Sequence, residues 1–170
     1  MMQVYRIEHW DGPRCIAQAD NLAAFLDVVL PDDWSNFAEK LAGRRSLSAH
    51  IAFNGEGRLI GLKLGYERNR GVFYSWIGGV APEARGQGIA AALMAAQHTW
   101  AKKEGFRGLE TATRQPNQAM AILNLKAGFV VAGLDVKPGE PTKILFYKVL
   151  SILPRLGSQH NLSGANPLCT

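Results

Sequence analysis

The residues best suited to chemistry form one glycine-rich loop, Arg85-Gly86-Gln87-Gly88-Ile89-Ala90, where an apolar stretch gives way to a long helical repeat. The N-terminus of a helix leaves about four backbone N–H groups without partners and carries a partial positive charge. Such an end binds anions and suits a pyrophosphate. Because Gly86 and Gly88 have no Cβ atom, phosphate oxygens can approach their backbone closely, and Arg85 can add positive charge. The loop predicts a phosphate-binding site, against the simpler interpretation of a glycine turn that only starts a helix.

Two other phosphate-binding patterns compete for this loop. Residues 86–91 also spell G-x-G-x-x-A, the fingerprint of a dinucleotide-binding fold of the NAD type, and Glu110 follows about 20 residues later. That fingerprint belongs to the first strand of a parallel βαβ unit, whereas antiparallel strands are expected before this loop. Glu110 also falls inside its strand rather than at the end of it. A P-loop is excluded because no Gly-Lys-Ser/Thr sequence follows.

The elements on either side of the loop differ in hydrophobic periodicity. Residues 72–80 are apolar on both faces, as in a central strand, whereas Ile89, Leu93 and Trp100 recur at helical spacing. This helix is expected to end at Gly105. Further strands are expected at residues 3–9, 48–53, 58–66, 107–113, 130–136 and 144–150, and further helices at residues 21–30, 33–42 and 117–127.

This order of elements predicts an α+β (mixed α/β) fold, in which helices pack on one central mixed, mostly antiparallel sheet. The sheet is expected to have about seven strands, flanked by about four helices. A chain of 170 residues suits one domain with one sizeable core. Residues 1–150 are expected to form this single domain, and the polar residues 151–170 a C-terminal tail.

Two segments resemble the signatures of the GNAT superfamily of acyl-CoA-dependent N-acetyltransferases. Residues 80–90 are similar to its motif A, Arg/Gln-x-x-Gly-x-Gly/Ala. Residues 117–129 resemble its second signature, in which an Asn precedes a helix and a Gly-Phe pair opens the next strand. The order and spacing of both segments match, as does the coarse strand order from residue 3 to 150. The resemblance implies an enzyme that transfers an acetyl group directly from acetyl-CoA to an amine.

The resemblance also implies where acetyl-CoA binds. Its pyrophosphate is expected on the glycine-rich loop, and its pantetheine arm along a strand that splays from its neighbour. Independently of the family, Gly78-Gly79 indicates a bulge or a close backbone approach within that strand. The residues implied in binding are Gly79, Val80, Ala81, Arg85, Gly86, Gln87, Gly88, Ile89, Ala90, Asn117 and Asn124.

One departure from the family concerns the proton for the leaving thiolate. The family commonly supplies it from a tyrosine seven residues after the first Asn of the second signature, but Asn124 stands there. A carboxamide donates hydrogen bonds but is not an acid. Asn117 and Asn124 share one face of a helix, where both could contact the thioester, although Asn117 also suits an N-cap and Asn124 a solvated position. A non-catalytic acyl-CoA-binding regulatory module is therefore the alternative function.

The general base has two candidates, Glu67 and Tyr74. Relatives often place a glutamate on the strand before motif A, but residues 72–80 contain none. Tyr74, Trp76 and Gly78 are expected on one face of that strand. An aromatic strand residue is more often core, and a chain of water molecules could replace a dedicated base. With Asn124, these two residues complete the candidate catalytic set.

The amino-acid composition and charge limit the classes of partner that the protein is expected to bind. Hydrophobic residues make up 47% of the chain and the net charge is +5, but the basic residues are scattered, which makes a nucleic-acid partner unlikely. Two distant cysteines form neither a metal site nor a disulfide framework, so no metal is expected and the compartment is expected to be the cytoplasm. Without an apolar run long enough to span a bilayer, no membrane partner is expected. The expected partners are a small-molecule or peptide amine acceptor and a second copy of the chain in a homodimer.

Overall fold

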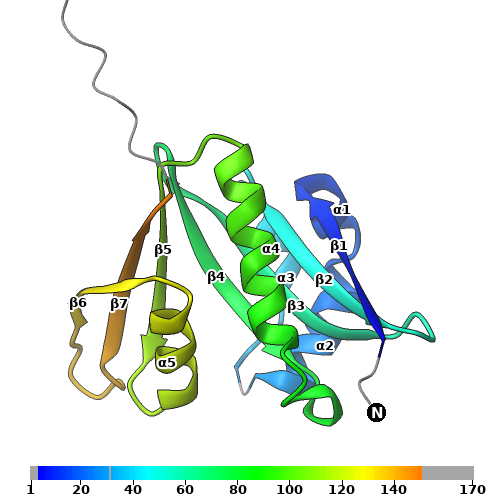
Figure 1. The fold of residues 1–170 in the computed structure, drawn as a ribbon. Coiled ribbons are helices and arrows are strands. Elements are labelled where there is room, and N and C mark those ends of the chain that lie inside the picture. The colour runs from blue at the N-terminus through cyan, green and yellow to red at the C-terminus, as the bar shows by residue number, and fades with distance from the viewer. Residues whose placement is uncertain (1–3, 31, 151–170) are drawn as a thin grey trace, which may run out of the picture.

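One seven-stranded sheet, ordered β1-β2-β3-β4-β5-β7-β6, forms the centre of the computed structural model, which describes residues 4–30 and 32–150 (Figure 1). Every neighbouring pair is antiparallel except β4 and β5, so the predicted mixed, mostly antiparallel sheet is confirmed. The strands are β1 (Tyr5–Asp11), β2 (Ser48–Asn54), β3 (Leu59–Asn69), β4 (Val72–Val80), β5 (Gly108–Arg114), β6 (Val130–Asp135) and β7 (Lys143–Val149). The helices are α1 (Gly12–Ala17), α2 (Ala19–Val29), α3 (Phe37–Leu41), α4 (Ile89–Lys103) and α5 (Gln118–Lys126), with a short 3-10 helix, η1 (Pro82–Ala84).

Helices cover both faces of the sheet. The strand side chains divide between these faces: Leu62 and Leu64 pack in the cluster formed with α1, α2 and α3, whereas Ala52 and Ile60, beside a register shift between β2 and β3, pack against α4. A further cluster, including Phe73 and residues of α4 and α5, lies on the same side as α4. We call these the α2 face and the α4 face. The proposed tail, residues 151–170, lies outside the described residues.

The parallel strands β4 and β5 are joined over only three residue pairs, which end at Tyr74 and Glu110. Beyond that point the strands diverge, and Figure 1 shows the open fork between them, with α4 on one side and α5 on the other. The hydroxyl of Thr111 donates to the Ser75 carbonyl at 2.8 Å and so closes the narrow end of the fork. The fork leaves the second half of β4 without a strand neighbour on its β5 side.

A bulge in β4 changes which residues share a face. Leu64 pairs with Ile77 but the next residue, Gly65, pairs with Ser75, so Trp76 is the extra residue. Trp76 and Ile77 consequently both pack on the α2 face, and Gly78 faces α4. The predicted shared face of Tyr74, Trp76 and Gly78 is wrong, because the bulge reverses the alternation before Gly78.

The N-terminal helices also differ from the prediction. Three helices are present where two are expected, because the sequence pattern predicts no helix over the residues of α1. Asp11 caps α1 by accepting the Arg14 N–H at 3.0 Å, and Pro13 occupies its first turn. The predicted helix over residues 33–42 is only α3, preceded by Asn36 in the left-handed region with φ of 54°.

Candidate active site

The glycine-rich loop forms an anion cradle at the start of α4. Gly88 is the N-cap, and both Gly86 and Gly88 have positive φ, 76° and 78°. A Cβ atom on either glycine would meet no atom within 4 Å, so the space above the loop is open. Among the described residues, the backbone N–H groups of residues 86–91 have no hydrogen-bond partner, and the buried Oε1 of Gln87 has none either. The free backbone N–H donors fit a pyrophosphate, as the sequence predicts.

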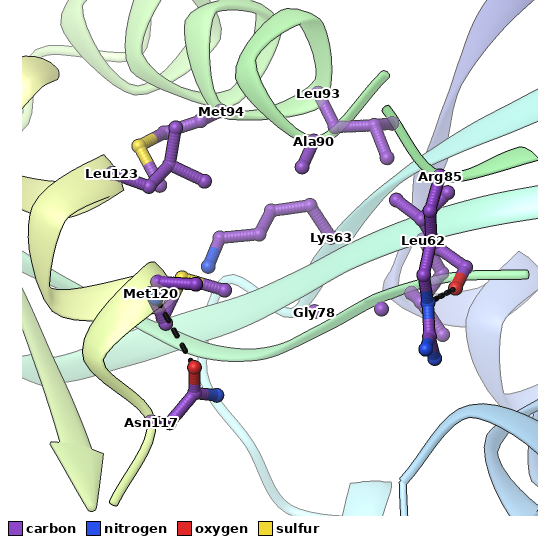
Figure 2. Close-up of a pocket in the computed structure, with 13 residues that line it drawn as sticks. Leu62, Lys63, Gly78, Arg85, Ala90, Leu93, Met94, Asn117, Met120 and Leu123 are labelled. Atoms are coloured by element: carbon purple, nitrogen blue, oxygen red, sulfur yellow. Dashed lines mark hydrogen bonds between the residues drawn. The ribbon is translucent and has the colours of Figure 1, made fainter. Parts of the chain in front are cut away.

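A cavity of about 220 Å³ extends from this cradle into the fork (Figure 2). Its walls come from β3, the end of β4, the loop, α4 and α5. The lining residues are Leu62, Lys63, Gly78, Gly79, Val80, Arg85, Ala90, Leu93, Met94, Asn117, Ala119, Met120 and Leu123. The cavity therefore brings together five of the predicted binding residues: Gly79, Val80, Arg85, Ala90 and Asn117. Most of its lining is aliphatic, which suits an alkyl arm more than a second charged group.

The unpaired edge of β4 lies along this cavity. Residues 78–80 pair regularly with β3 on one side and have no strand on the other. Arg85 holds the end of this edge, because its Nε donates to the Val80 carbonyl at 3.2 Å. Gly79 permits a close approach of α2, since a Cβ there would lie 2.6 Å from Cγ2 of Val29. An extended, amide-containing arm can add to such an edge as a strand would.

The two asparagines of α5 lie in different surroundings. Asn117 caps the helix, because its Oδ1 accepts the Met120 N–H at 3.1 Å, and it also lines the cavity. Asn124 is 1% exposed, so the expectation of a solvated position is wrong. Its Nδ2 donates to Thr113 Oγ1 at 3.0 Å, while its buried Oδ1 has no partner within residues 4–30 and 32–150. Asn124 thus bridges α5 and β5 and is not part of the cavity wall.

The two candidate bases lie away from this cavity. Glu67 accepts the Gly71 N–H at 3.0 Å and pairs with Arg45 at 3.5 Å, and these contacts lower the pKa of its carboxyl, the hydrogen bond most strongly. This geometry favours a structural role for Glu67 in the turn after β3. Tyr74 packs edge-on against Tyr66 on the α2 face. Burial raises the pKa of the Tyr74 phenol, so it keeps its proton near neutral pH and is suited to donate hydrogen bonds.

A second cavity, of about 330 Å³, contains Tyr74 and opens beside the same fork. It also contains Glu110, the partner of Tyr74 in the last β4–β5 pair, together with Tyr147, which pairs with Glu110 across β7. Residues 21–41 contribute nothing to its lining, but the final hairpin contributes Ala132, Leu145, Phe146 and Tyr147. The first cavity thus lines the open part of the fork at residues 78–80, and the second contains Tyr74, Glu110 and Thr111 at its narrow end.

The sequence did not single out Lys63, which lines the first cavity and is 6% exposed. The only feature in the sequence that could have indicated Lys63 is its charge, because it stands between Leu62 and Leu64 in an otherwise apolar strand. Burial lowers the pKa of its amine to about 8. Nearby on the α4 face, Lys148 Nζ lies 3.1 Å from His98 Nδ1. Burial, followed by repulsion from Lys148 and Lys63, lowers the pKa of His98 to about 4.

Within the described part of the chain, no group of three or more His, Cys, Asp and Glu side chains could hold a metal ion. No described helix combines the length and apolar character needed to cross a membrane.

An anion cradle at the start of α4, an unpaired strand edge and an aliphatic cavity in the fork suit a class of protein that binds a phosphorylated ligand with an extended arm. Residues 5–129 match the model of the Acetyltransferase (GNAT) family. The chain belongs to this family, and it is an N-acetyltransferase that uses acetyl-CoA as cosubstrate and acts on amino groups. No curated protein sequence matches the chain.

Solved structures share the fold at low sequence identity. The ribosomal-protein-S18-alanine N-acetyltransferase from Escherichia coli is 15% identical, with a TM-score of 0.75 over 90% of this chain and 98% of that chain. The IAA acetyltransferase from Bacillus cereus ATCC 14579 is 19% identical, with a TM-score of 0.68 over 86% and 99% of the two chains. A GCN5-related N-acetyltransferase from Kribbella flavida is 18% identical, with a TM-score of 0.66 over 85% and 97%.

Proposed function

We propose that acetyl-CoA occupies the first cavity and that the acceptor amine reaches the thioester from the second. The observation that carries this proposal is the β4–β5 fork, which has one cavity along its open part and a second at its narrow end. The pyrophosphate lies on the free N–H groups of residues 86–91, and the pantetheine arm follows the open edge of residues 78–80. The acetyl group then lies at the fork.

The second cavity suits a cationic primary amine on a small molecule or peptide. Glu110 is the one carboxylate in its lining, and Tyr147 adds aromatic surface, which attracts cations. Glu110 attracts the protonated amine, and a water molecule beside the carboxylate carries away its proton. Tyr74, which stays protonated, donates a hydrogen bond that orients the acceptor. Arg68, stacked 4.9 Å over the Tyr74 ring, gives the cavity a cationic rim that disfavours acceptors with several adjacent charges.

Two further proposals concern the setting of the enzyme. We propose that residues 1–150 act as a single domain in the cytoplasm, in keeping with the free, buried thiol of Cys15. We also propose a homodimer, because the end of the sheet formed by β6 and the adjacent α5 exposes several large apolar side chains. These are Ile122, Leu125, Val130, Val131, Leu134 and Val136. Light scattering on the purified chain measures this association directly.

The test of the proposed function is release of CoA thiol from acetyl-CoA over a panel of amines. The panel contains small monoamines, polyamines, amino acids, and peptides with a free N-terminus or a lysine. We expect at least one cationic primary amine to raise thiol release well above the rate without acceptor. Binding of acetyl-CoA together with the same background rate across the whole panel would contradict the proposal.

A further inference from the structure

Lys63 reaches from β3 across β4 to the fork. It pairs with Gly78 in the β3–β4 ladder, and its side chain crosses the space where a Cβ of residue 78 would lie. That Cβ would be 2.9 Å from Cδ and 3.3 Å from Nζ of Lys63. Figure 2 shows the side chain extended across the cavity above Gly78, with its nitrogen directed toward α5. Because Gly78 has no side chain, the Lys63 amine has room to extend into the fork.

The amine of Lys63 has no counter-charge. Among residues 4–30 and 32–150 it makes no hydrogen bond or ion pair, and burial is the sole cause that lowers its pKa. The charged and titratable groups that face it are all basic: His50, its partner on β2; His98 from α4, with Lys148 from β7 behind it; and Arg85 from the loop. The residues of β4 and α5 that line the cavity carry no titratable side chain. An ammonium in such surroundings is suited to an anion that arrives with a ligand.

The family's reaction produces one such anion. When the acceptor nitrogen forms its bond to the acetyl carbon, the C–S bond breaks and its electron pair stays on sulfur. A free thiol has a pKa of about 8.5, so the thiolate gains from a proton donor of similar pKa. Arg85 does not release protons near neutral pH. Lys63 is thus the one group in the cavity lining that can exchange a proton with the sulfur.

We propose that the ammonium of Lys63 receives the departing sulfur of CoA and donates its proton to the thiolate as the C–S bond breaks. This inference rests on the placement of acetyl-CoA in the first cavity. The products are then the acetylated amine, CoA as a thiol and neutral Lys63. The proton lost by the acceptor nitrogen leaves to solvent, and Lys63 regains a proton from water after CoA departs. Asn124, which stands at the position of the family's tyrosine, is not an acid. The proton for the thiolate therefore comes from Lys63 on β3.

Calorimetric binding of CoA and acetyl-CoA between about pH 6 and pH 8 tests the proposal without an acceptor. The proteins compared are the wild type, Lys63→Met, which keeps the length and removes the amine, and Lys63→Arg, which keeps the positive charge. In the wild type, the thiol of CoA binds beside the ammonium of Lys63. The bound pair carries one proton fewer than the two separate groups, so binding of CoA releases one proton. Binding that releases a proton tightens as the pH rises. Acetyl-CoA has no thiol and serves as the reference ligand.

We expect the affinity for CoA relative to acetyl-CoA to rise by about tenfold over this range in the wild type and in Lys63→Arg. In Lys63→Met the relative affinity should stay flat over this range, because only the neutral thiol enters the apolar cavity, and a free thiol stays mostly neutral below its pKa of about 8.5. The same flat ratio in all three proteins would overturn the role of Lys63. So would an acetyl group found on Lys63 by mass spectrometry after incubation with acetyl-CoA, because Lys63 would then be a nucleophile. Failure of every protein to bind either ligand would instead overturn the proposed function.

Discussion

Burial sets the proton affinity of the basic side chains beside the fork. His98 and His50 both have their pKa lowered to about 4, with burial as the largest cause. Neutral His98 offers Nδ1 to Lys148, whose Nζ also donates to the Ala127 carbonyl at 2.6 Å. These contacts join α4, β7 and the end of α5 behind the first cavity. The His98 imidazole therefore stays uncharged unless the pH falls well below neutral.

The two histidines predict a pH-dependent stability. Their pKa is about 6.5 when unfolded and about 4 when folded, so the unfolded chain binds more protons between these values. The free energy of unfolding should therefore rise from about pH 4 to about pH 6.5. Urea unfolding across this range measures the effect. His98→Gln, which keeps a hydrogen-bond acceptor for Lys148, should have a shallower slope, and a slope equal to that of the wild type would contradict the account.

At the scale of elements, the fork depends on how β3 holds β4 at the bulge. Gly65 lies where the register shifts, and a Cβ there would lie 2.4 Å from the Tyr74 carbonyl and 2.5 Å from the Phe73 ring. The carbonyl belongs to the backbone, so it cannot move aside as a flexible side chain can. Gly65→Ala should lower the free energy of unfolding by more than about 2 kcal/mol.

Gly133→Ala is the matched control for this change. Gly133 also lies in a strand, β6, but its nearest neighbour would be Cδ1 of Leu145 at 3.9 Å, an ordinary contact. We expect a change within about 0.5 kcal/mol in thermal or urea unfolding. Equal destabilisation by both substitutions would show that the bulge does not require a glycine at position 65.

Elements with long periodic patterns could be predicted from the sequence, whereas irregularities that depend on a partner strand, such as the β4 bulge, could not. The helix after the loop and the hairpin turn at residues 54–57 follow from local spacing and glycine, and both are present. The bulge at Trp76 depends on which β3 residues oppose it, which no local pattern encodes. For α1, Asp11 and Pro13 gave a capping signal, but six residues show too little periodicity to be distinguished from a turn.

The same limit applied to the site. The anion cradle is contiguous in sequence, so its spacing alone indicated it. Lys63 reaches the cavity only because β3 pairs with β4 and Gly78 leaves a gap, and that conjunction spans separate segments. The sequence alone therefore indicates the loop that we propose for the cosubstrate, whereas the amine that faces the cavity is evident only from the packing of the sheet.

At the scale of the whole molecule, we propose that the two cavities bind the two substrates on separate surfaces. Glu110 belongs to the second cavity and not to the first. Glu110→Gln keeps the shape and removes the charge, so it should raise the KM for a cationic amine by about tenfold. Its Kd for acetyl-CoA should equal that of the wild type. Steady-state kinetics and calorimetry separate these effects, and a parallel loss of acetyl-CoA binding would argue against two separate surfaces.

We propose above all that acetyl-CoA binds on the free N–H groups at the start of α4. Calorimetry with acetyl-CoA on Gly88→Ala and Gly105→Ala tests it most directly, because both glycines have positive φ, 78° and 84°, and open space around them. Both substitutions should cost about 1 kcal/mol of stability. Only Gly88→Ala, which puts a methyl group in the phosphate cradle, should weaken binding, by roughly a hundredfold. Wild-type affinity in Gly88→Ala, or an equal loss in Gly105→Ala, would contradict the account.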